Sequence, residues 1–143
     1  MDYQIVTAII TAGTTLIVVV VSFFLNENAK RKAEWQQKKF GRYQKLLQAL
    51  SGLAVDGKDK HRANMDFSAA SNTVGLIASQ KVITALMAFH NEVKWENKAN
   101  SSSERHDKLL QELMLAIRED VGLSKKDDPD TFDFHLIGAG PKR

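Results

Sequence analysis

A run of uncharged, mostly apolar residues from Ile5 to Leu25 constrains this chain more than any other feature. A helix over these 21 residues is about 30 Å long, which matches the hydrocarbon thickness of a bilayer. A secretory signal peptide would instead have basic residues first, a shorter apolar stretch and a small-residue cleavage site. The chain begins Met1-Asp2 with no basic residue before the run. The sequence therefore predicts a retained transmembrane helix over residues 5–25.

Basic residues follow this run and none precedes it, which predicts the orientation of the span. The basic residues that follow are Lys30, Arg31, Lys32, Lys38, Lys39, Arg42 and Lys45. By the positive-inside rule, residues 1–4 are outside the membrane and residues 26–143 are in the cytoplasm, as in a bacterial inner-membrane protein. A basic collar in this position attracts anionic headgroups, so we expect its first five residues to lie at the membrane surface.

Hydroxyl residues follow one side of the predicted span and form a hydroxyl stripe. The stripe consists of Thr7, Thr11, Thr14, Thr15 and Ser22. At about 100° per residue these positions fall within about 100° of one another on a helix, and Ile17, Val20 and Phe24 lie on the other side. Membrane helices pack through small and hydroxyl residues, so we expect a homo-oligomer face, with a pore as an extension of that hypothesis. The alternative is a monomeric anchor whose hydroxyl groups bond to their own helix.

The rest of the chain has helical patterns and no sheet of any size. No proline interrupts residues 26–54, so the span is expected to continue as a basic juxtamembrane helix over that range. A cytoplasmic helical domain over 60–137 and a flexible tail over 138–143 are expected to follow. The predicted fold class is all-α, with one N-terminal transmembrane helix that continues into a small cytoplasmic bundle of three or four helices.

Capping residues and apolar stripes predict the helices of this bundle. Ser79 is a good N-cap for a helix with one apolar face. The apolar face consists of Val82, Leu86, Phe89 and Val93. Ser103 is expected to cap the last helix and Gly122 to end it. A weak alternation over Thr131–Ile137 predicts a short extended segment.

The sequence offers little for catalysis. Cysteine is absent, which excludes disulfides, thiolate nucleophiles and thiolate metal sites. The four histidines form no His-Glu-x-x-His motif, and the chain has no glycine-rich phosphate loop and no Gly-x-Ser-x-Gly. The adjacent acids Glu119 and Asp120 do not face each other on a helix and are interpreted as surface charge. We therefore expect no enzyme, no cofactor and no metal site.

One cationic cluster, Arg118 with Lys125 and Lys126, lies at the predicted end of the last helix. Three cations near a loop can receive a phosphate-bearing ligand such as a nucleotide signal. The alternative, which we favour, is that they complement the helix C-terminus and its dipole. The basic collar is interleaved with Trp35 and Phe40, a pattern that also occurs in nucleic-acid-binding proteins. Because the collar directly follows a predicted span, membrane topology and contact with lipid headgroups are the first explanation, and direct nucleic-acid binding is a weaker alternative.

The stretches LIASQKVITALMAF and LMLAIREDVGL resemble a run common in uncharacterised bacterial proteins with one span, a basic collar and a small helical domain. The layout itself carries a second resemblance. It resembles small single-span membrane effectors of bacterial antiphage systems, such as the accessory membrane protein of type VI-B CRISPR systems. The resemblance covers most of the chain in architecture and carries over no functional residue. It implies an oligomeric membrane pore or depolarising assembly, switched by a cytoplasmic defence protein or a second messenger.

Two functional hypotheses follow from the sequence. The first is a homo-oligomeric inner-membrane effector that forms a pore or perturbs permeability, controlled through its cytoplasmic domain. The alternative is a membrane-tethered adaptor whose helical bundle binds a protein or nucleic-acid partner, with a passive span.

Overall fold

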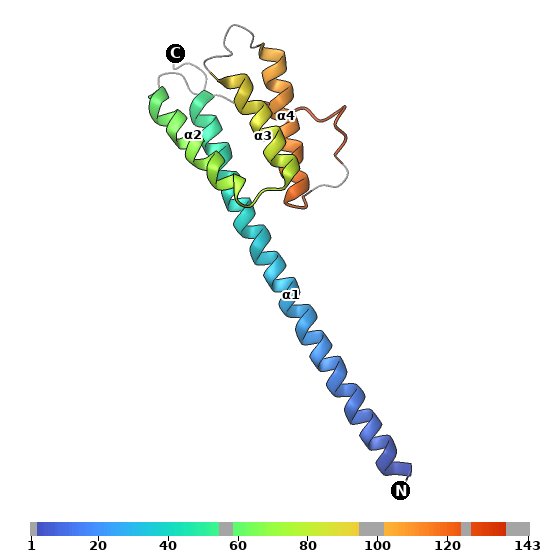
Figure 1. Cartoon of the computed structure of the whole chain (residues 1–143). Helices are drawn as coiled ribbons and strands as arrows, with labels where there is room; N and C mark the ends of the chain where they lie inside the picture. The colour runs from blue at the N-terminus through green and yellow to red at the C-terminus, as the bar shows by residue number, and fades with distance from the viewer. Residues whose placement is uncertain (1–2, 55–58, 95–101, 124–126, 137–143) are drawn as a thin grey trace, which may run out of the picture. The chain divides into compact units, whose positions relative to one another are not determined.

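A computed structural model of the chain describes residues 3–54, 59–94, 102–123 and 127–136, and it describes their side chains except those of residues 6–13. Four α-helices make up most of the described residues (Figure 1). They are α1 (Tyr3–Ala54), α2 (Lys60–Gly75), α3 (Gln80–Val93) and α4 (Ser103–Asp120). No strand occurs in the described ranges, so the prediction of an all-α fold is confirmed there.

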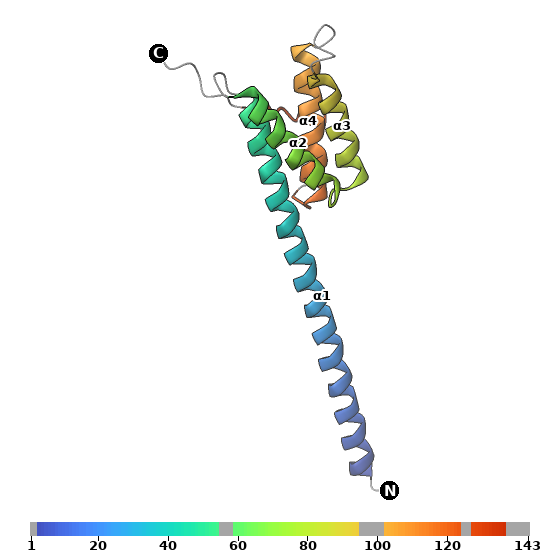
Figure 2. The ribbon, with the colours of Figure 1, turned by 60° about the vertical axis from the view of Figure 1, so that its left-hand side comes forward.

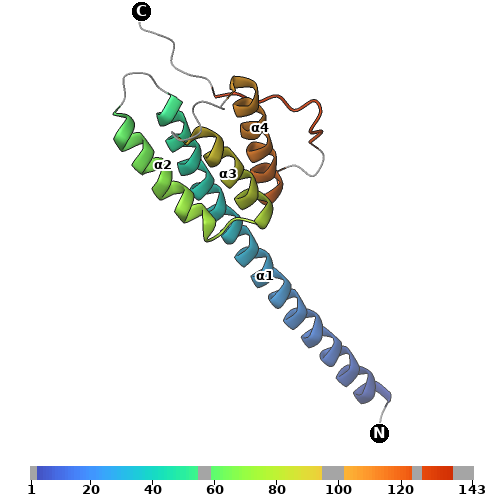
Figure 3. The ribbon, with the colours of Figure 1, turned by 45° about the horizontal axis from the view of Figure 1, so that its top comes forward.

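The chain divides into two compact units, residues 1–37 and residues 38–143. The first unit contains the N-terminal part of α1. The second unit is a helical bundle in which residues 38–54 of α1 pack with α2, α3 and α4. Within the bundle, α1 and α2 lie on one side and α3 and α4 on the other (Figure 3).

The core of the second unit consists of apolar stripes from all four helices. In α1 the stripe is Tyr43, Leu46 and Leu50, all at most 2% exposed. Its spacing of three and four residues puts the three side chains on one helix face. The other core residues are Phe67, Val74, Val82, Leu86, Phe89, Leu110, Leu113, Ala116 and Ile117. Burial of these side chains is the main driving force that holds the bundle together.

The N-terminal ends of α3 and α4 are capped by serines, and one of the two N-caps differs by one residue from the prediction. The Ser79 hydroxyl accepts a bond from the Val82 N–H at 3.5 Å, so Ser79 is the N-cap of α3, as predicted. The N-cap of α4 is Ser102, whose hydroxyl accepts a bond from the Arg105 N–H at 3.1 Å. The prediction of Ser103 is wrong by one residue, because consecutive serines offer the same capping chemistry.

Gly122 ends α4 with a left-handed backbone conformation, φ 74°. Its N–H bonds to the Glu119 carbonyl at 3.0 Å, and the Leu123 N–H bonds to the Arg118 carbonyl at 2.9 Å. This pair of bonds is the Schellman motif, which satisfies carbonyls that a helix end leaves open. The predicted stop at Gly122 is confirmed.

Two glycine substitutions are expected to change stability in opposite directions. Gly122→Ala should lower the free energy of unfolding by about 1 kcal/mol, because an L side chain disfavours this φ. Gly41→Ala should raise it by up to about 1 kcal/mol, because Gly41 lies inside α1. No atom lies within 4 Å of a Cβ added at either position, so packing does not oppose either change. Thermal unfolding of the full chain in a mild detergent, followed by circular dichroism, measures both, and a loss on Gly41→Ala would contradict the expected pattern.

The end of α3 departs from the predicted stripe. Val93 is 37% exposed, whereas Glu92 is only 3% exposed. The Glu92 carboxylate accepts a bond from the Ser102 N–H at 3.2 Å and pairs with Arg105 at 3.3 Å. A carboxylate at a helix N-terminus is favoured by the helix dipole. Glu92 is therefore buried because it connects the end of α3 to the beginning of α4.

The segment after α4 folds back on the bundle without forming a strand within residues 127–136. Phe134 and Leu136 pack against the core, and Gln111 donates to the Asp133 carboxylate at 2.9 Å. The predicted extended segment Thr131–Ile137 thus keeps its alternation of exposed and half-buried residues up to Leu136. Its last residue, and the predicted tail over 138–143, lie outside the described residues.

Candidate functional site

The hydroxyl stripe belongs to the first unit, and part of it is described. Thr14, Thr15 and Ser22 are exposed on α1. The side chains of Thr7 and Thr11 lie outside the described set. The large apolar side chains from Leu16 to Leu25 are 46–66% exposed. Within the described part of the chain, no helix combines the length and the apolar character needed to cross a membrane.

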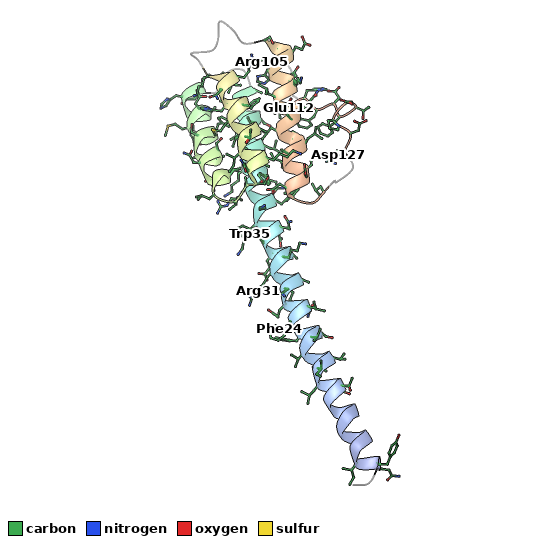
Figure 4. The ribbon with its side chains drawn as sticks, turned by 45° about the vertical axis from the view of Figure 1, so that its right-hand side comes forward. Phe24, Arg31, Trp35, Arg105, Glu112 and Asp127 are labelled. Carbon is green, nitrogen blue, oxygen red and sulfur yellow. The ribbon has the colours of Figure 1, made fainter. Side chains whose placement is uncertain are left out.

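The basic collar spans both units. Lys30, Arg31 and Lys32 are exposed on the first unit. Figure 4 shows Arg31 on α1 between Phe24 and Trp35, and spacings of seven and four residues put these three on one helix face. Lys38 is exposed in the second unit, whereas the Lys39 side chain is only 13% exposed.

Asp120, in the last turn of α4, is the centre of a polar network inside the bundle. The Lys39 ammonium lies 3.0 Å from both carboxylate oxygens. The Tyr43 hydroxyl donates to Oδ2, and the Ser79 backbone N–H donates to the same oxygen at 3.4 Å. The Asp120 side chain is only 9% exposed. One carboxylate therefore connects α1, the beginning of α3 and the end of α4.

The interpretation of Glu119 and Asp120 as surface charge is correct for the first residue and wrong for the second. Glu119 pairs with Lys81, and both side chains are more than half exposed. Asp120 lies about 100° further around α4, which turns its carboxylate toward Lys39. A buried carboxylate needs charged or hydrogen-bonded partners, and Asp120 has both.

The network shifts the pKa values of two of its members. Burial raises the pKa of Tyr43 strongly, and its hydrogen bond to Asp120 and the Asp120 charge raise it further. Burial also acts to raise the pKa of Asp120, but hydrogen bonds from Tyr43, Lys39 and the Ser79 backbone, with the Lys39 charge, outweigh it. The net result is a pKa of Asp120 below its ordinary value. Asp120 is therefore ionised and Tyr43 neutral at neutral pH.

A sequence signal for this network existed at Lys39. Lys39 precedes Tyr43 by four residues and Leu46 by seven, so it continues the buried stripe of α1. A cation on a buried stripe requires a carboxylate partner from another element. The proximity of Lys39 to the predicted span obscured this signal. The identity of the partner could not be deduced, because Asp120 is 81 residues away.

Arg118 is paired with Asp127 at the surface of the bundle, and its side chain is 36% exposed. Its guanidinium donates to the two oxygens of Asp127 at 2.7 and 3.4 Å and lies 5.8 Å from the centre of the Phe132 ring. The hydrogen bond and charge of Asp127 raise the pKa of Arg118. Lys125 and Lys126 lie outside the described residues. A phosphate-bearing ligand at Arg118 would have to displace the Asp127 carboxylate.

Two histidines contact aromatic residues beside a pocket of about 520 Å³. His90 stacks on Phe67 with ring centres 6.0 Å apart, and His106 meets Phe89 edge to face at 5.0 Å. In the described residues, no group of three or more histidine, aspartate or glutamate side chains is placed to hold a metal ion. The two imidazoles therefore act as packing partners of the aromatic core.

Comparison with protein-family models, with curated proteins and with solved structures found no match to this chain in any of the three.

Proposed function

We propose that the chain is a single-span protein of the bacterial inner membrane whose N-terminal helix self-associates, and that the assembly forms a pore or otherwise perturbs membrane permeability. The helical bundle controls the assembly from the cytoplasm. The resemblance in layout to antiphage effectors supports defence as the setting, with a cytoplasmic defence protein or a nucleotide signal as the trigger. Membrane lipids and further copies of the chain are its first partners.

The uncharged run from Ile5 to Leu25 is the observation that carries this proposal. Its length suits a bilayer, and its hydroxyl stripe suits contact between helices rather than contact with lipid. Thr14, Thr15 and Ser22 and the bulky apolar side chains around them are all exposed on α1, so both faces of the helix are open to contact with lipid or with another helix. Trp35 and the collar residues after the run match the aromatic and basic anchors of a membrane interface.

The Asp120 network supports control by the bundle. α1 continues without a break from Tyr3 to Ala54. Lys39 and Tyr43 hold its C-terminal part against α4 through Asp120. A ligand or partner that rearranges the bundle therefore acts on the same helix that carries the hydroxyl stripe.

The proposal is tested by removing hydroxyl groups while keeping side-chain shape. In the double variant Thr14→Val/Thr15→Val we expect weaker self-association, by about 1 kcal/mol for each hydroxyl hydrogen bond between helices. Two such losses weaken the association constant by about tenfold or more. Native mass measurement in detergent reads the oligomer, and a voltage-sensitive dye reads depolarisation of bacteria that express the chain. Both signals should fall together.

The matched control is Ile17→Val/Val20→Ile on the opposite face, which conserves composition and leaves the hydroxyl stripe intact. It should behave as the wild type in both measurements. A monomeric wild type in detergent would contradict self-association. Depolarisation that persists unchanged in Thr14→Val/Thr15→Val would contradict permeability through an assembly that uses this stripe.

The second candidate function is a membrane-tethered adaptor. A surface groove of about 1320 Å³ between α3 and α4 favours it, because a groove of this size can receive a segment of another protein. Capture of a partner by the bundle without any depolarisation would favour the adaptor over the effector.

A further inference from the structure

A groove with two cations runs between α1 and α2 of the bundle. Arg42 and Lys45, both exposed, line it from α1, and Asp66 lines it from α2. Half-buried Ala49 and Ala70 also line it, so side chains of another surface can approach closely there. Its volume is about 470 Å³. We call this surface the basic groove.

A second groove, of about 1320 Å³, runs between α3 and α4 and has the opposite charge. Its described lining residues include the carboxylates of Glu112, Glu119 and Asp127 and the ammonium of Lys81. Glu119 pairs with Lys81 and Asp127 with Arg118, so Glu112 is the lining carboxylate that has no ion pair among the described residues. Its alanines are Ala85, Ala88 and Ala116, of which the last is buried. Figure 4 shows Glu112 on α4 and Asp127 in the segment beside it. We call this surface the acidic groove.

The two grooves belong to opposite sides of one bundle. The basic groove uses only α1 and α2, and the acidic groove uses α3, α4 and the segment that follows α4. Figure 3 draws α1 and α2 on one side of the bundle and α3 and α4 on the other, and in Figure 2 α2 crosses between α1 and the α3–α4 pair. A single copy therefore cannot bring its own two grooves together.

We infer that the basic groove of one copy docks on the acidic groove of a second copy. Opposite charge selects the pairing, because it juxtaposes Arg42 and Lys45 with the Glu112 carboxylate, whereas pairing of two basic grooves juxtaposes equal charges. The alanines in both grooves let helices of the two copies approach closely, as small residues do at other helix contacts. The occupant is a further copy because the complementary surface is on the same chain.

This pairing is head to tail, since each copy uses a different surface for each neighbour. Head-to-tail contacts build a closed ring when the rotation between copies closes, and an open chain otherwise. A ring of bundles suits an assembly around a membrane pore. The inference rests on the proposed self-association. It adds a second contact, between the bundles of neighbouring copies, and specifies that this contact is head to tail.

Cysteine cross-linking tests the pairing directly, because the chain has no cysteine of its own. Gln48 lines the basic groove and Thr84 the acidic groove, and both are exposed. Full-length chains with Gln48→Cys and with Thr84→Cys, carrying different tags, are co-expressed and oxidised in inner-membrane vesicles. We expect a disulfide-linked dimer from the mixture and little from either chain alone. Gln48→Cys mixed with Glu104→Cys, at the exposed beginning of α4, is the matched control and should not cross-link.

Two further variants sharpen the result. A chain with both Gln48→Cys and Thr84→Cys should give a ladder of dimers, trimers and larger species, because each copy then links to two neighbours. Arg42→Glu/Lys45→Glu should lower the heterotypic yield at least about tenfold, since like charges then meet across the contact. Both substituted residues are exposed, so the bundle keeps its fold.

Three outcomes overturn the inference. Strong homotypic cross-links from Gln48→Cys alone would show a two-fold contact instead. Cross-linking of Thr84→Cys to a different protein, and not to a second copy, would assign the acidic groove to an adaptor partner. If differently tagged chains co-purify but Gln48→Cys and Thr84→Cys do not cross-link, self-association stands and the groove pairing is wrong. If the tagged chains do not co-purify at all, the proposed function itself is contradicted.

Discussion

Asp120→Ala is expected to lower the free energy of unfolding of the bundle by about 3 kcal/mol. The substitution leaves the Lys39 ammonium, 13% exposed, without its carboxylate. It also leaves the buried Tyr43 hydroxyl without its acceptor. Removing one member of a buried charge pair costs more than the pair contributes, because the remaining charge stays desolvated. Thermal unfolding of the full chain in detergent should shift down by at least about 10 °C.

Glu119→Ala is the matched control, since Glu119 is the preceding residue and its pair with Lys81 is exposed. An exposed ion pair contributes about 0–1 kcal/mol, so this variant should unfold close to the wild type. Equal destabilisation by the two variants would mean that the Asp120 network does not hold the bundle together.

Acidification should remove the difference between Asp120→Ala and the wild type. The folded-state pKa of Asp120 is lowered from its ordinary value of 3.8. A lowered folded pKa contributes stability above the unfolded value, and that contribution is lost as the pH falls through the folded value. The two unfolding curves should be far apart at pH 7 and approach each other below about pH 4. If the stability difference between the two proteins stayed constant across this pH range, the ionised Asp120 carboxylate would not be the cause of that difference.

The bundle was largely predictable from sequence, because its helices are amphipathic and end at recognisable residues. The stripe from Val82 to Phe89 and the stop at Gly122 need only local information, namely spacing and the conformational freedom of glycine. The choice between Ser102 and Ser103 as N-cap was not predictable, since the two residues have the same chemistry. Glu92 was also missed, because its burial depends on the start of the next helix.

The polar site was predicted less well than the fold. Lys39 and Asp120 are far apart in the sequence, and no local pattern specifies that two such residues meet. The sequence position of Lys39 near the predicted span favoured a contact with lipid. The adjacent acids Glu119 and Asp120 favoured an interpretation as surface charge. Only the position of Lys39 on the buried stripe of α1 contradicted the first interpretation. Long-range ion pairs of this kind become visible when the helices are packed.

Phe89→Ala is expected to cost about 3–4 kcal/mol of bundle stability. The ring is 2% exposed and belongs to the core shared by all four helices. Truncation loses the buried area of the ring and its edge-to-face contact with His106. Met87→Ala, two residues earlier on α3 and 46% exposed, is the control and should change unfolding by less than about 1 kcal/mol.

Phe89→Ala also tests separately the two contacts that we propose, one through the hydroxyl stripe and one between the grooves. The hydroxyl stripe lies in residues 1–37 and Phe89 in residues 38–143. Above its lowered unfolding temperature, Phe89→Ala should therefore lose cross-linking between the basic and acidic grooves, which needs a folded bundle. Co-purification of differently tagged chains should persist, since we propose that it depends on the hydroxyl stripe. Loss of co-purification in Phe89→Ala would show that the bundle, and not the hydroxyl stripe, drives assembly. The Thr14→Val/Thr15→Val variant should give the reverse result, with weaker co-purification and an unchanged unfolding temperature of the bundle.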